Sequence, residues 1–99
     1  MKHETQRTIS DWARETFGEP KSNLSVAIRA NEEMAEMLAC LNRDDGDQHA
    51  AEEAADIIIT LAVMFDRLGI DMVAEINRKM RINRERQWRL DGQGHGYHL

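Results

Sequence analysis

Two acidic runs separated by a turn occupy residues 32–56, EEMAEMLACLNRDDGDQHAAEEAAD. The first run carries Glu33 and Glu36, and the second carries Glu53 and Asp56. Residues three apart on a helix lie about 60° apart around its axis, so each pair projects from one face. The stretch therefore predicts two helices, each with a pair of carboxylates on one side.

The turn signal at residues 42–47, NRDDGD, predicts that the two helices fold back on each other as an antiparallel hairpin. In such a hairpin the two residue numbers of every facing pair have the same sum. The centre of symmetry of this pairing lies between Asp44 and Asp45. The resulting pairs are Glu33 with Asp56 and Glu36 with Glu53. Four carboxylates at one level of a helix pair repel one another unless a cation is bound. The pattern therefore predicts a site for a hard divalent cation, with Mg²⁺ as the expected ion and Mn²⁺ as the alternative.

The remaining sequence is typical of one helical domain. Its 99 residues allow a single small core, and the chain has one proline and no strand-like alternation of β-branched residues. We expect an all-α bundle of about four helices per chain, with the hairpin at its centre and one domain over residues 1–99. The expected helices cover about residues 10–17, 22–41, 48–68 and 71–88, with Ser10 as the first N-cap and an irregular, glycine-rich tail at 90–99.

Apolar residues on the helix expected at 48–68 step by three and four, as on a core-facing helix. They are Ala54, Ile57, Ile58, Leu61, Phe65 and Leu68. Further apolar residues lie outside this stripe, namely Ile59, Ala62, Val63 and Met64. We expect a second subunit to cover them, which gives a homodimer or homotetramer with a four-helix core. The alternative is a monomer in which the helix at 10–17 covers this face.

The last expected helix also carries apolar residues that should face the core. They are Met72, Val73, Ile76 and Met80.

Charge is unevenly distributed along the chain. The formal net charge is −5, yet residues 77–89 hold a cluster of lysine and arginine against Glu85 alone. An acidic body with one basic segment suits a small polyanion held by metal and cations together. The acidic remainder would repel long nucleic acid, so we expect no nucleic-acid partner.

Three further features bear on where the protein acts. No apolar run reaches the ~18 residues needed to cross a bilayer. Residues 1–7 are polar and contain no apolar signal segment. The single cysteine, Cys40, cannot form an internal disulfide and is expected to be a small buried hydrophobe. Together they predict a cytoplasmic protein without a membrane partner.

Three motifs are notable in this chain: EEMAE at residues 32–36, EAAD at 53–56 and KMRINR at 79–84. Together they resemble the motifs of the MazG-like nucleotide pyrophosphohydrolases, which belong to the all-α NTP pyrophosphohydrolase superfamily. The resemblance extends over roughly residues 10–88. The segment WARETFG at residues 12–18 is also similar to the start of the dATP/dGTP pyrophosphohydrolase subgroup.

The resemblance implies Mg²⁺-dependent hydrolysis of a nucleoside triphosphate between its α- and β-phosphates, which yields a monophosphate and pyrophosphate. By matching position, the implied metal ligands are Glu33, Glu36, Glu53 and Asp56. Lys79 and Arg84 would neutralise charge that grows on the phosphates, and Asn83 would donate a hydrogen bond. Glu32, a spare carboxylate beside the cluster, is the candidate base for the attacking water.

Aromatic and histidine residues add weaker candidates. Trp12 and Trp88 could each stack on a base, with burial in the small core as the alternative. Trp12 lies in the segment that resembles the subgroup. His95 and His98 fit a metal pair or a lid over the nucleotide, with a flexible tail that carries incidental histidines as the alternative.

Three other classes of function are alternatives to the enzyme. A non-catalytic helical dimerisation or regulatory protein could keep the same fold. A nucleic-acid-binding module would use residues 78–89 as a basic helix. A di-iron carboxylate protein would need Glu-x-x-His, and no glutamate of the two acidic runs has a histidine three residues later.

Overall fold

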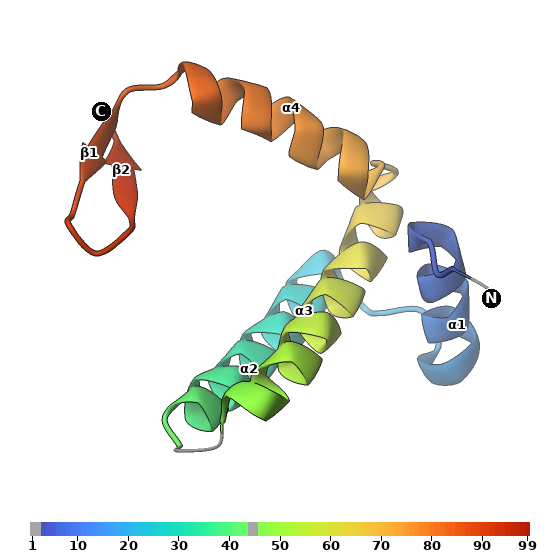
Figure 1. The fold of residues 1–99 in the computed structure, drawn as a ribbon. Coiled ribbons are helices and arrows are strands. Elements are labelled where there is room, and N and C mark those ends of the chain that lie inside the picture. The colour runs from blue at the N-terminus through green and yellow to red at the C-terminus, as the bar shows by residue number, and fades with distance from the viewer. Residues whose placement is uncertain (1–2, 44–45) are drawn as a thin grey trace.

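The computed structural model describes residues 3–43 and 46–99, which form four helices followed by a two-stranded hairpin (Figure 1). The elements are α1 (Gln6–Phe17), α2 (Asn23–Leu41), α3 (Asp47–Leu68), α4 (Met72–Glu85), β1 (Trp88–Leu90) and β2 (Gly96–His98). The expected class, a mostly helical chain with four helices, is confirmed. The expectation of an irregular tail is wrong, because β1 pairs antiparallel with β2.

The first helix begins four residues earlier than the sequence predicted. Thr5 is its N-cap, because the Thr5 hydroxyl accepts from the Thr8 amide and the Thr8 hydroxyl accepts from the Thr5 amide. Ser10, the expected cap, lies inside α1 and is fully buried. Its hydroxyl donates to Asp66 on α3, so this serine joins two helices instead of starting one.

The central pair, α2 and α3, forms the predicted antiparallel hairpin (Figure 1). The Ser22 side chain caps α2 by accepting from the Ser25 amide. Gly69 ends α3 with φ 70°, a left-handed conformation that favours glycine. The predicted centre of symmetry, between Asp44 and Asp45, lies outside the described residues.

The buried face of α3 differs from the predicted stripe. Ala62 and Val63, which the stripe left out, are buried, whereas Ile58 and Leu68 are about half exposed. The reason is α1, which packs against α3 (Figure 1). The short first helix therefore covers part of the apolar face that lies outside the predicted stripe. This covering within one chain is what the alternative of a monomer required. The core of the described residues is small, and its buried apolar members are Val26, Cys40, Ile57, Ala62 and Val63.

The fourth helix turns away from the end of α3 and carries the β-hairpin at its far end (Figure 1). It ends at Glu85 rather than near Trp88, because Arg86 is extended and Trp88 belongs to β1. Val73, Ile76 and Met80 were expected to face the core, and this expectation is wrong for the single chain, where all three are exposed. None of the helices that the structure describes has the length and apolarity of a bilayer-spanning segment.

Candidate metal centre and adjoining cavity

Three carboxylates from the two arms of the hairpin meet at one point. Glu33 comes from α2, and Glu53 and Asp56 come from α3. Each of them offers an oxygen that lies within 4.8 Å of the others. Glu33 is 5% exposed, Glu53 is partly buried and Asp56 is exposed. A group of oxygen donors at this separation has the chemistry of a site for a hard divalent cation.

The surroundings of Glu33 destabilise the ionised form of its carboxyl group. Burial raises the pKa of the Glu33 carboxyl, and the negative charges of Glu36 and Asp56 raise it further. The Arg29 guanidinium acts in the opposite direction, with its Nη2 2.7 Å from Glu33 Oε1. The carboxylate is therefore held next to like charges with one positive partner, an arrangement that a bound cation would stabilise.

Glu53 gives an independent sign that the cluster fits a metal. Its Oε2 is buried and has no hydrogen-bond partner among the described residues. Buried polar atoms are normally paired, and leaving one unpaired costs about 1–3 kcal/mol or more for a charged group. An oxygen that accepts no hydrogen bond and lies beside two other carboxylates is free to serve as a metal ligand.

The other predicted acidic residues lie at the edge of this cluster. Glu36, one of the four expected ligands, is exposed and is not among the three that converge. It follows Glu33 by one turn of α2 and is close enough to raise the pKa of Glu33. Glu32, the candidate base, is exposed and pairs with Arg29, with Oε2 3.0 Å from Nη1. The structure thus brings three of the four expected ligands together.

A cavity of about 600 Å³ adjoins the cluster, between α1, α2 and α3. Its charged lining residues include Arg29, Glu33 and Asp56 from the region of the cluster, together with Arg14 and Glu19. Its apolar lining residues include Trp12, Phe17, Ile59 and Val63. The volume lies within the usual range for small-molecule sites, about 300–1,000 Å³. A ligand with an anionic group and a flat apolar group would match this mixed lining.

The aromatic residues of α1 form one wall of the cavity. Trp12 and Phe17 meet edge to face, with ring centroids 5.5 Å apart and an interplanar angle of 86°. Trp12 is 51% exposed, so it is not the buried core residue that the sequence left as an alternative. Trp88, the other candidate, is also exposed and packs edge to face against His98 in the β-hairpin.

The predicted phosphate-binding residues are not at this cavity. Lys79, Asn83 and Arg84 lie on α4, and none of them is among the described residues that line it. Lys79 and Arg84 are exposed, whereas Asn83 is partly buried and its Oδ1 has no hydrogen-bond partner in the described chain. Within one chain, the structure therefore separates the basic segment from the acidic cluster. His95 and His98 belong to the C-terminal hairpin segment and take no part in the cluster.

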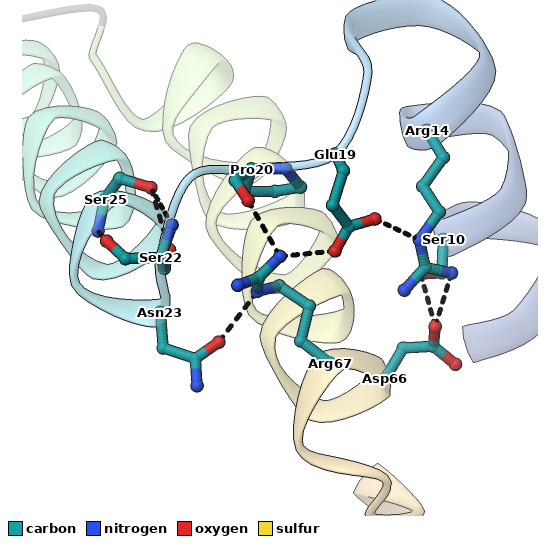
Figure 2. A network of polar contacts seen from close by, with 9 residues as sticks. All are labelled: Ser10, Arg14, Glu19, Pro20, Ser22, Asn23, Ser25, Asp66 and Arg67. Atoms are coloured by element: carbon teal, nitrogen blue, oxygen red, sulfur yellow. Dashed lines mark hydrogen bonds and ion pairs between the residues drawn. The ribbon is translucent and has the colours of Figure 1, made fainter.

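A polar network that sequence reasoning missed fixes the wall of the cavity (Figure 2). Arg14 on α1 contacts Asp66 on α3 at 2.6 Å and Glu19 in the following loop at 2.7 Å. Glu19 also pairs with Arg67 of α3, whose Nη1 donates to the Pro20 carbonyl at 2.9 Å. These contacts join α1 and the α1–α2 loop to α3, and their partners are more than forty residues apart in the sequence. The spacing of residues within a single helix therefore could not predict them.

The network also sets the charge of its acidic members. Hydrogen bonding from Arg14 holds the pKa of the Asp66 carboxyl below its usual range, and the Ser10 hydroxyl adds to this effect. Arg14 lowers the pKa of Glu19 in the same way. At Glu33 burial outweighs the single partner Arg29, whereas at Asp66 and Glu19 the arginine contacts outweigh burial, so these two carboxylates need no metal.

Taken together, the fold and the site define a class: all-α proteins in which a helical hairpin presents carboxylates from both arms beside a cavity. A dATP/dGTP diphosphohydrolase of Salmonella phage PMBT28 is 32% identical over 97 residues, 97% of this chain. The chain spans only 31% of the length of that relative. No protein-family model matches the chain.

A solved structure shares the fold over nearly the whole chain. It is the MazG-like pyrophosphohydrolase of cyanophage S-2L, bound to dGDP and three catalytic Mn²⁺ ions per active site. The two structures superpose with a TM-score of 0.76 and 26% sequence identity, covering 95% of this chain and 88% of the other. The chain therefore shares the fold of this MazG-like enzyme, in agreement with the resemblance of its motifs.

Proposed function

We propose that this chain is a metal-dependent nucleoside triphosphate pyrophosphohydrolase, with residues 1–99 acting as one domain. The observation that carries the proposal is the convergence of Glu33, Glu53 and Asp56 beside a cavity of about 600 Å³ that Glu33 and Asp56 line. The phage relative is a dATP/dGTP diphosphohydrolase and the cyanophage enzyme binds dGDP, which supports a purine deoxynucleotide as substrate. Such nucleotides are made and used in the cytoplasm, which is the proposed location.

The acidic cluster would hold Mg²⁺ or Mn²⁺. Glu33, Glu53 and Asp56 would supply the first oxygens, and Glu36 would join them by rotating toward Glu33 from the same face of α2. The unpartnered Oε2 of Glu53 fits this role. When bound, the ion polarises phosphate oxygens and makes a water more acidic.

The remaining side chains would bind the substrate and move the proton. Glu32, exposed beside the cluster, would accept a proton from the water that attacks the α-phosphorus. The bond from that phosphorus to the α,β-bridging oxygen then breaks, and pyrophosphate leaves. Trp12 and Phe17, which line the cavity, would contact the base.

We propose that α4 reaches the active site of a second copy of the chain. Lys79, Asn83 and Arg84 lie away from the cavity of their own chain, yet α4 carries the basic charge that a triphosphate requires. The apolar residues of α4 are exposed in the single chain, and a partner would cover them. A homodimer or homotetramer would satisfy both needs at once.

A pyrophosphate-release assay over the common deoxynucleoside and ribonucleoside triphosphates, with Mg²⁺ or Mn²⁺ and with EDTA, tests the proposal. We expect turnover of at least one nucleotide that EDTA abolishes. Glu53→Gln should lower turnover by at least about 100-fold. Glu52→Gln is the matched control, because Glu52 is the preceding residue but is exposed and outside the cluster. No turnover of any nucleotide, or full turnover in Glu53→Gln, would contradict the proposal.

A further inference from the structure

Arg29 is the cation that neutralises the acidic cluster in the described chain. Its Nη2 lies 2.7 Å from Glu33 Oε1, and its Nη1 lies 3.0 Å from Glu32 Oε2. The same side chain lines the cavity together with Glu33 and Asp56. It therefore bridges a candidate metal ligand and the candidate base while it faces the space where a substrate would lie.

A second arginine at the cavity shows why Arg29 is different. Arg14 also lines this space, but it is held by Asp66 and Glu19, which lie outside the cluster. Metal binding would leave those contacts unchanged. Arg29, in contrast, owes its position to the negative charge of the cluster itself. These two are the cations that line the cavity within residues 3–43 and 46–99.

A divalent ion on Glu33 would remove the attraction that holds Arg29. Two positive charges would then share one carboxylate, and the guanidinium would be repelled. The Arg29 side chain is 57% exposed and long, so it can rotate without disturbing the core. The nearest new partner is whatever anion occupies the cavity, and a guanidinium matches a phosphate with two parallel hydrogen bonds.

We propose that Arg29 exchanges partners: it neutralises Glu33 while the cluster holds no metal, and it binds a phosphate of the nucleotide once the metal is present. This inference rests on the proposed function and adds to it a phosphate-binding residue from the same chain as the cluster. It also makes metal and nucleotide favour each other's binding, because the metal releases the arginine that the phosphate captures.

The competing explanation is an ordinary ion pair between neighbouring turns of a helix. Arg29 precedes Glu32 by three residues and Glu33 by four, a spacing at which such pairs are common and weak. The chain supplies a matched control in Arg78, which pairs with Glu75 at the same three-residue spacing on α4 and does not line the cavity. Arg78→Gln removes a helix-surface ion pair without touching the cluster.

Calorimetric titration with Mn²⁺ in the absence of nucleotide tests the first half of the exchange. The variants are Arg29→Gln, Arg29→Lys and the control Arg78→Gln. Without Arg29 the ion no longer has to displace a competing cation, so we expect Mn²⁺ to bind about fivefold more tightly to Arg29→Gln than to the unmodified chain. Arg29→Lys keeps the charge and should change the affinity less, and Arg78→Gln should leave it unchanged.

Kinetics with saturating Mn²⁺ test the second half. Loss of one charge-assisted hydrogen bond to phosphate should raise KM for the nucleotide about tenfold in Arg29→Gln, with a smaller rise in Arg29→Lys. The inference is overturned if the unmodified chain binds Mn²⁺ and Arg29→Gln matches the unmodified chain in both Mn²⁺ affinity and KM. If the unmodified chain binds no Mn²⁺, the proposed function itself fails, and this inference fails with it. A folded Arg29→Lys keeps the test decisive if Arg29→Gln does not fold.

Discussion

At the scale of single residues, the carboxylates near the cavity differ because of their immediate neighbours. Glu33 has lost most of its water, and this burial is the main cause of its raised pKa. Asp66 accepts hydrogen bonds from Arg14 and Ser10, which hold its pKa below the usual range. One acidic group is therefore suited to receive a cation, whereas the other is already satisfied and holds two helices together.

The lowered pKa of Asp66 predicts a pH-dependent contribution to stability. A carboxyl whose pKa is lower in the folded state stabilises the protein above its unfolded pKa of about 3.9, and this stability is lost as pH falls through the folded value. Asp66→Asn should therefore lower the free energy of unfolding at pH 7 by about 2 kcal/mol. The difference from the unmodified chain should shrink steadily as the pH is lowered below about 4.

Urea unfolding at several pH values measures this difference. Asp11→Asn is the control, because Asp11 is exposed and its contact with Arg7 is long, at 3.9 Å. It should change stability by less than about 0.5 kcal/mol. A stability loss in Asp66→Asn that is the same at pH 3 and pH 7 would show that the ion pairs with Arg14 and Arg7 are not its cause.

Local spacing was enough to find the acidic residues but not the partners that come from other elements. Glu33, Glu53 and Asp56 could be placed together because three-residue steps and one turn fix their faces. Arg29 lies four residues before Glu33, so helix geometry alone offered a signal for it. Ser10 and Asp66 are 56 residues apart, and their contact depends on how α1 packs, which no short pattern encodes.

At the scale of elements, the helix ends that depend on local caps were predicted well. Ser22 before α2 and Gly69 after α3 act through their own side chain or backbone, and the expected ranges 22–41 and 48–68 agree with these helices to within one residue. The start of α1 was missed because Thr5 and Thr8 cap each other upstream of Ser10. The C-terminal strands were missed because a glycine-rich segment gives little strand signal, although Gly92 and Gly94 supply the positive φ angles of the connecting turn.

The position of α1 predicts a role for Trp12 in substrate binding. Stacking of a base on an aromatic side chain is worth about 1–3 kcal/mol, so Trp12→Ala should raise KM for the nucleotide about tenfold or more. Trp88→Ala is the control, because Trp88 packs on His98 in the β-hairpin and does not line this cavity. Steady-state kinetics on both variants measures the effect. An equal rise in KM for the two variants would place the base elsewhere.

At the scale of the whole molecule, the described chain leaves much apolar surface in water. Exposed apolar residues occur on all four described helices, and those that do not line the cavity include Leu24, Ile28 and Leu38 on α2, Ile58 on α3, and Val73 and Ile76 on α4. Large apolar patches on soluble proteins usually mark interfaces. The sequence predicted that a second subunit covers such a face, but no local pattern says which residues of α4 would meet it.

This surface predicts that the chain assembles into at least a homodimer. Ile76→Glu would place a charge in the interface and should shift the mass in solution toward the monomer, because an unpaired buried charge costs several kcal/mol. Light scattering coupled to size-exclusion chromatography gives the mass directly. Asn77→Glu is the control, since the next residue on α4 is already polar and points about 100° away. A monomeric unmodified chain would refute the prediction.

The central claim is that carboxylates from both arms of the α2–α3 hairpin form one metal site. Calorimetric titration of the unmodified chain with Mg²⁺, beside Glu53→Gln and Glu52→Gln, tests it most directly. We predict saturable binding by the unmodified chain and by Glu52→Gln, and no measurable binding by Glu53→Gln. Equal binding by all three proteins, or none by any of them, would contradict the claim.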